Sequence, residues 1–127
     1  MNLAPFVSVD ETSFSASRED ILAAWGTPGR TCRNSVGLTE LDYGTVVFRF
    51  QDCGRLEEIT RKTQAVHLGA VAVPFRSLER FVQDHDSSAF ERAGFVVSPK
   101  FGLAFDPICP PWVTALAKHC IESWRAL

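Results

Sequence analysis

Apolar and polar positions alternate along residues 40–51, which read ELDYGTVVFRFQ. Within this stretch Val46, Phe48 and Phe50 share one face, while Arg49 and its alternating neighbours share the other. A period of two residues is typical of a strand that buries one face. The pattern therefore predicts a strand whose apolar face packs on the core.

Three further segments continue this β pattern. The turn at 52–54 contains a glycine that can adopt positive φ, and residues 55–60, RLEEIT, are expected to return as the hairpin partner. The apolar run at 65–73 predicts another strand. Residues 95–107 predict a hairpin that turns at 99–100, with phenylalanines and a leucine on one face and small residues on the other.

A short helix is expected near the N-terminus, over about 17–26. Ser17 can cap its first turn, and acidic residues follow where the helix dipole favours negative charge. Gly26 can close the helix in a left-handed conformation, and Pro28 prevents its continuation. Residues 27–38 are then expected to form a connection without regular structure.

Helical spacing reappears in the second half of the chain. Apolar residues recur at helical intervals through 74–86, and residues 88–94 have the spacing of a capping box that predicts one more short helical turn. The segment 110–127 predicts the longest helix, because its prolines suit a first turn. The core-facing stripe of that helix would comprise Trp112, Leu116, Cys120 and Trp124.

These elements predict an α+β fold in a single globular domain, residues 1–127. The expected architecture is an antiparallel sheet of about four to five strands packed against a long C-terminal helix and two shorter helices. With 46% hydrophobic and 22% charged residues, the composition is that of an ordered globular protein. A chain of this length can bury a core without disulfides or metals.

Charge and hydropathy limit the classes of partner. The formal net charge is −2 and the basic residues are scattered, so a nucleic-acid partner is not expected. The first residues lack the pattern of a secretory signal, and no run of about 18 apolar residues could cross a bilayer. We therefore expect a cytoplasmic protein without a membrane partner, whose four cysteines are reduced and occur in no C-x-x-C pair.

The sequence contains little that indicates catalysis or a cofactor. The stretch WGTPGRT, residues 25–31, follows a helix and lacks the lysine of a phosphate-binding loop. His119 and Cys120 are adjacent, so on a helix they would point about 100° apart, which argues against one shared metal ion. Glu57 and Glu58 are consecutive on a strand and are expected to face opposite sides. We therefore expect no catalytic residues, no metal ligands and no cofactor, although a zinc site assembled from distant positions stays open.

One stretch resembles a known family. The order S-x-x-D-I-L-x-x-W-G-x-P followed by LDYGTVVFRFQDCGRLEEI, within residues 15–60, resembles the repeat unit of the β-lactamase-inhibitor-protein-like fold, which also occurs in small outer-membrane assembly lipoproteins. The chain departs from that pattern: it has one copy of the unit, no lipidation cysteine near its start and a different C-terminal half. The resemblance implies a binding module that uses the face of a sheet.

In size, charge and lack of catalytic motifs the chain is also similar to bacterial immunity proteins. We therefore expect an inhibitor or immunity-type protein that blocks a partner protein, such as a toxin or an enzyme, by steric occlusion, as a monomer or a homodimer. Binding surfaces favour aromatic anchors and complementary charge. The candidate partner-binding residues are Trp25, Tyr43, Glu57, Glu58, Asp84 and Asp86.

Two alternatives stay open. The first is a small-ligand-binding domain or enzyme with a pocket between the sheet and the C-terminal helix, lined by His67, His119 and cysteines. A pocket that encloses several titratable side chains would favour this alternative. The second is a structural role as a homodimer, which would need an unpaired apolar sheet edge.

Overall fold

The chain folds around one antiparallel sheet of eight strands. The computed structural model describes residues 1–127. In spatial order the strands are β10 (Phe90–Arg92), β11 (Phe95–Ser98), β12 (Leu103–Phe105), β13 (Trp112–Leu116), β7 (Leu56–Lys62), β6 (Val46–Phe50), β5 (Thr39–Asp42) and β4 (Arg30–Arg33). The sheet has two halves, β4 to β7 and β10 to β13. They meet at the centre, where β13 pairs with β7 and Thr114 lies opposite Thr60.

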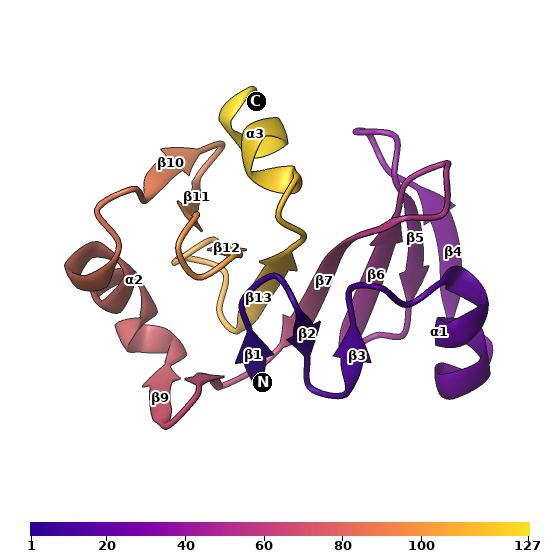
Figure 1. Cartoon of the computed structure of the whole chain (residues 1–127), viewed down its shortest axis with the longest axis horizontal. Coiled ribbons are helices and arrows are strands. Elements are labelled where there is room, and N and C mark those ends of the chain that lie inside the picture. Colours follow the sequence, from indigo (N-terminus) through magenta and orange to yellow (C-terminus); the bar gives the residue numbers. More distant parts are fainter.

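Smaller elements cover one face of this sheet. They are a three-stranded sheet of β1 (Leu3–Ala4), β2 (Ser8–Val9) and β3 (Thr12–Ser13), a hairpin of β8 (Ala65–Leu68) and β9 (Val71–Pro74), and the helices α1 (Arg18–Trp25) and α2 (Phe75–His85). Figure 1 shows β1 to β3 in front of the central strands, with α1 and α2 at opposite ends. The third helix, α3 (Cys120–Arg125), follows β13 directly. None of the three helices is both long and apolar enough to cross a lipid bilayer.

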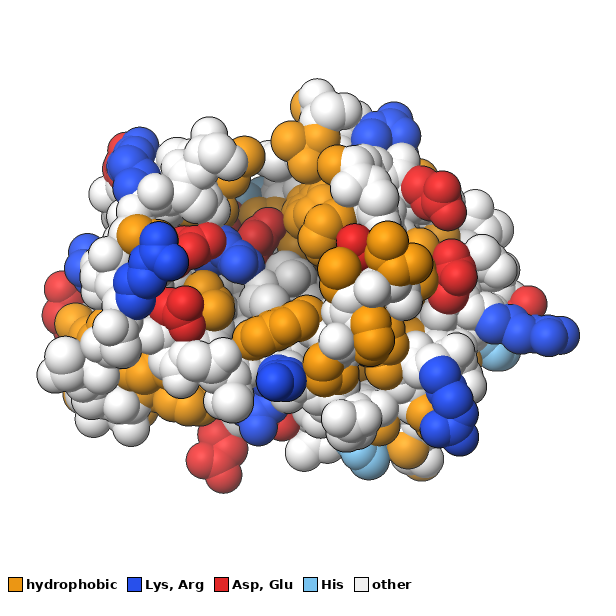
Figure 2. Space-filling model, turned by 180° about the vertical axis from the view of Figure 1, so that it is seen from behind, with side chains coloured by type: hydrophobic (Ala, Val, Ile, Leu, Met, Phe, Trp, Pro, Cys, Tyr) orange, Lys and Arg blue, Asp and Glu red, His pale blue; other side chains and the backbone are white.

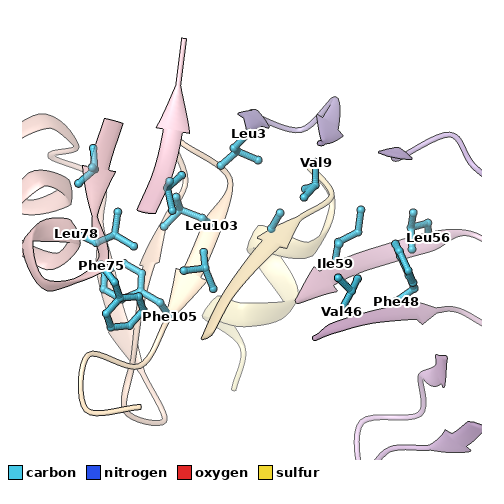
Figure 3. Packing of buried hydrophobic residues seen from close by; sticks show 14 of the residues in the cluster. Leu3, Val9, Val46, Phe48, Leu56, Ile59, Phe75, Leu78, Leu103 and Phe105 are labelled. Atoms are coloured by element: carbon cyan, nitrogen blue, oxygen red, sulfur yellow. The ribbon is translucent and has the colours of Figure 1, made fainter. Parts of the chain in front are cut away.

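The main hydrophobic core lies between the large sheet and this covering layer (Figure 3). Leu3 and Val9 of the small sheet belong to the same buried cluster as Phe48 and Ile59 of the central strands. Apolar area removed from water contributes roughly 25 cal/mol per Å², and this cluster contains 19 buried residues, so it is the larger of the two sources of apolar stabilisation. A smaller apolar cluster lies beneath α3 and includes Val97, Ala104, Leu116 and Ile121.

The predicted N-terminal helix is confirmed. The Ser17 hydroxyl accepts a hydrogen bond from the backbone N–H of Asp20 at 3.1 Å, and the Asp20 carboxylate accepts one from the backbone N–H of Ser17 at 2.9 Å. Gly26 ends the helix with φ of 77°. This reciprocal capping box satisfies two free amides of the first turn.

The two predicted hairpins and the helix over 74–86 are confirmed as well. On β6 the predicted core residues Val46, Phe48 and Phe50 are all buried. The single strand expected over 40–51 is wrong, however, because the chain breaks at 43–45 into β5 and β6, which pair with each other as a hairpin. The second hairpin pairs β11 with β12, and α2 occupies residues 75–85.

The predicted C-terminal helix is wrong, and so is the predicted sheet of about four to five strands. Residues 112–116 form β13 in the interior of an eight-stranded sheet, and only 120–125 are helical. Val113 and Ala115 are buried on one side of β13, and Thr114 and Leu116 are buried on the other. A strand covered on both faces loses the apolar and polar alternation, so its pattern cannot be distinguished from that of a buried helix.

Three smaller expectations also need correction. The predicted helical turn at 88–94 is instead β10 and a turn, because the Ser88 hydroxyl bonds Asp86 rather than capping a helix. The connection at 27–38 contains β4. The strand predicted at 65–73 is split into β8 and β9 by a turn in which Gly69 has φ of 63°.

Candidate functional site

The second face of the large sheet is only partly covered, and it carries a groove. A cavity of about 500 Å³ lies between α3 and the β4–β5 hairpin, and one of about 470 Å³ lies beside it over β5, β6 and β13. The two share Glu40, Arg49, Phe95 and Thr114 in their walls, so they form one continuous depression, called here the open groove. Figure 2 shows this hollow, with charged side chains inside and hydrophobic side chains along its walls.

Arg49 forms the centre of the groove floor. Its Nε donates to Glu40 Oε2 at 2.7 Å, and its Nη1 donates to Thr60 Oγ1 at 2.5 Å and lies 3.4 Å from Glu58 Oε1. The Thr60 hydroxyl lies 2.8 Å from that of Thr114 on the next strand. The floor is thus a hydrogen-bonded network across four adjacent strands, which holds its polar groups in fixed positions.

The pKa values of Glu40 and Glu58, the two carboxylates beside Arg49, are shifted in opposite directions. Burial pushes the pKa of Glu40 upward, but the hydrogen bond and charge of Arg49, aided by Cys32 and Asn34, outweigh it and lower the pKa. Burial is the dominant influence on Glu58, and its pKa is raised despite Arg49 and the indole of Trp124. Glu40 is therefore the more firmly ionised partner of Arg49.

A β-bulge brings a third carboxylate to the end of the groove. Arg49 pairs with Glu58 but Phe50 pairs with Leu56, so Glu57 is the extra residue on β7. Both Glu57 and Glu58 therefore line the same cavity, which corrects the expectation that they face opposite sides. Glu57 is only 2% exposed.

Glu57 is surrounded by three partners. Arg55 donates from Nε and Nη2 to Glu57 Oε1, each at 3.1 Å. On the other oxygen, Oε2 accepts a hydrogen bond from Cys120 Sγ at 3.0 Å and contacts Nε2 of His119. His119 directly precedes α3 and Cys120 is its first residue, and both side chains reach Glu57 Oε2, although adjacent helical positions were expected to point about 100° apart.

Cys120 is not arranged as a nucleophile. Burial raises the pKa of its thiol well above the ordinary value, and the hydrogen bond and charge of Glu57 raise it further. An activated cysteine needs a neighbouring cation that stabilises the thiolate. Here the nearest ionisable partner is a carboxylate, so the thiol is kept protonated.

Aromatic side chains form the wall beneath α3. The Trp124 indole donates from Nε1 to Glu58 Oε2 at 3.1 Å, and its ring lies 5.2 Å from that of Phe95. Trp112 lines the other end of the groove. At the rim, the tip of the β4–β5 hairpin presents Val36, which is 63% exposed.

Of the predicted partner-binding residues, only Glu57 and Glu58 lie in the groove. Trp25 and Tyr43 pack together elsewhere, with ring centroids 5.5 Å apart, and both contact Phe48. The Tyr43 hydroxyl donates to the carbonyl of Gly26 at 2.8 Å. Trp25 keeps 40% of its surface exposed, so its side chain packs against the protein only in part and stays partly on the surface.

The two predicted aspartates lie near the end of α2. Asp84 is exposed and pairs with Arg80 at 3.7 Å. Asp86 is buried and accepts hydrogen bonds from the hydroxyls of Ser88 and Ser98 and from the backbone N–H of Lys100. Burial opposes ionisation of Asp86, but these bonds outweigh it and lower its pKa, so its position is that of a structural cap.

The groove residues that sequence reasoning missed are Glu40 and Arg49. The alternation on β6 placed Arg49 opposite the core face, so that signal was available. The suggested pocket lining of His119 and Cys120 is found, but His67 lies on β8, outside both cavities. Comparisons with protein-family models, curated proteins and solved structures found no match.

Proposed function

We propose that this protein is a non-catalytic binding module that receives a segment of a partner protein in the open groove. The observation that carries this proposal is the continuity of the groove across four adjacent strands of the sheet, from β13 to β5, with its polar floor already hydrogen-bonded. A preformed floor reduces the ordering cost that a partner would otherwise meet on binding. In the more specific form of the proposal, the module is an inhibitor or immunity-type protein that acts by steric occlusion.

The charges of the groove favour a basic partner segment. The carboxyl groups of Glu40, Asp42, Glu57, Glu58 and Asp106 line it, against the guanidinium groups of Arg49 and Arg55. Aromatic walls beside this acidic floor suit an arginine or lysine next to an apolar residue, because such pairs combine charge complementarity with burial. The acidic lining also argues against a nucleic-acid partner.

The titratable side chains of the groove also argue against catalysis. The titratable side chains on the groove floor are paired with one another, and the one buried thiol there is protonated. A general base or nucleophile needs a free, suitably tuned group facing the substrate. We include a cytoplasmic location in the proposal, because all four cysteines are free thiols and a reducing compartment preserves them.

A small ligand is the second candidate. One end of the groove lies between the sheet and α3 and encloses several titratable side chains, which is the arrangement expected of a ligand pocket. In that case the ligand would contact Trp124 and Glu58 at the inner end, and a substitution of Val36 at the rim would have little effect on its binding.

A matched pair of variants tests the proposal. Val36→Arg adds bulk and positive charge at the groove rim, whereas Val71→Arg makes the same change at the exposed tip of the β8–β9 hairpin, outside both cavities. We expect quantitative affinity capture from the source cell to enrich one protein with the wild type and Val71→Arg, and to lose it with Val36→Arg. Equal capture by both variants would contradict the proposal, and capture of a small molecule by all three would favour the second candidate.

A further inference from the structure

The three side chains at the inner end of the groove converge on one point. The ligand-type atoms of Glu57, His119 and Cys120 all lie within 4.8 Å of one another. They come from segments about sixty residues apart in the chain, namely the bulge of β7 and the start of α3. Carboxylate oxygen, imidazole nitrogen and thiol sulfur are together the donor types that bind zinc in proteins.

The surroundings orient these atoms toward the same point. Both hydrogen bonds of Arg55 go to Glu57 Oε1, which leaves Oε2 directed at His119 and Cys120. Partners that hold a ligating group from outside are typical of metal sites. The Glu57 side chain is 98% removed from solvent, so its orientation is set by the fold.

The remaining side of the cluster is accessible. The His119 side chain is 38% exposed and lines the cavity together with Ser123. A zinc ion with three protein ligands keeps a fourth position for water, and that position would face the groove.

We propose that Glu57, His119 and Cys120 form a binding site for a zinc-type divalent ion. Zinc takes oxygen and nitrogen ligands at about 2.0–2.2 Å and sulfur at about 2.3 Å, which separates tetrahedral ligand atoms by about 3.3–3.7 Å. The 3.0 Å between Glu57 Oε2 and Cys120 Sγ therefore needs only a small outward movement of both side chains. Magnesium and calcium are excluded, because they avoid sulfur and nitrogen ligands.

Binding replaces a hydrogen bond by a coordinate bond and involves no redox change. The proton that Cys120 Sγ shares with Glu57 Oε2 leaves to solvent, and the resulting thiolate donates its electron pair to the ion. The site would connect α3 to β7 through the metal. This inference is independent of the proposed partner, because it rests on the side chains of the site alone.

Cobalt(II) is the probe, since it adopts zinc sites and its bond to a thiolate gives a strong near-ultraviolet absorption. We expect the full-length, reduced protein to bind one Co²⁺ with this band and to release it when Zn²⁺ is added. Cys120→Ser should abolish the band, and His119→Gln should weaken binding by at least about tenfold. The His119 side chain is partly exposed, so this second variant preserves the fold, which circular dichroism would verify.

Exposed thiols supply the controls. Cys53→Ser and Cys109→Ser each remove an exposed thiol outside the cluster, and they should leave the band and the affinity unchanged. A folded wild type without the band would overturn the proposal, as would a band that persists in Cys120→Ser. Loss of partner capture in Val36→Arg with unchanged cobalt binding would show that the two sites act separately.

Discussion

The two faces of the large sheet differ in what they bury. On β6, Val46, Phe48 and Phe50 point into an apolar core, while Arg49 on the same strand points into a hydrogen-bonded polar floor. The covered face gains stability from burial of apolar area, which does not depend on direction. The open face holds charges in pairs, which contributes little net stability but fixes position. One strand thus supplies both the fold and the candidate binding surface, on opposite sides.

Replacement of a core phenylalanine should give the largest loss of unfolding free energy. Phe48→Ala removes a fully buried ring from the covered face and should cost about 3–5 kcal/mol of unfolding free energy. Phe95→Ala is the matched change in the open groove, where the ring is half-buried against Trp124, and it should cost less than half as much. Chemical denaturation measures both. Equal losses would mean that the two faces are not distinct.

Replacement of Arg49, the central arginine of the groove, should give the second-largest loss of unfolding free energy. Arg49→Met leaves Glu40 and Glu58 partly buried without their cation and should cost about 2–3 kcal/mol at neutral pH. The folded pKa of Glu40 is lowered, so its contribution is present above its unfolded pKa and is lost as the pH falls through the folded value. The deficit of the variant should therefore shrink on acidification.

A second arginine provides the control for this prediction. Arg61 pairs with Asp10 at 3.3 Å, and both side chains are about one third exposed. Arg61→Met should cost less than about 1 kcal/mol, because exposed ion pairs are screened by water. If Arg49→Met were equally mild at neutral pH, the network would not be holding the groove floor.

The smallest change in unfolding free energy is expected on replacement of Glu58, and this change should be a gain instead of a loss. Its folded pKa is raised, so its stabilising contribution is complete below the unfolded pKa and is lost as the pH rises through the folded value. Glu58→Gln keeps an oxygen that can accept from the Trp124 indole and should gain on the order of 0.5 kcal/mol at neutral pH. The gain should vanish in acid, and denaturation at both pH values would measure it. A loss at neutral pH would contradict the effect assigned to burial.

Sequence reasoning succeeded where local signals decide the structure. The capping box of Ser17, the glycine end of α1 and the alternation on β6 act within a few residues, so each could be recognised in isolation. The same is true of α2 and of the hairpin formed by β11 and β12. These elements supply two helices of the covering layer and three strands of the large sheet.

The open groove could not be predicted in the same way. Its floor depends on β13 pairing with β7, and the burial of β13 on both faces concealed it behind a helix-like pattern. Its inner end depends on a single bulge, which reverses the direction of Glu57 and leaves no local signature in RLEEIT. Because residues that act together there lie about sixty positions apart, only the folded topology brings them into contact.

The most direct test of the binding surface is photo-crosslinking in the source cell. A benzophenone amino acid placed at position 36 or at position 71 samples the groove rim and the covered side at exposed valines of two hairpin tips. We predict a covalent adduct with one protein at position 36 and none at position 71. An adduct only at position 71, or no adduct at position 36, would contradict the assignment of the open groove as the binding surface.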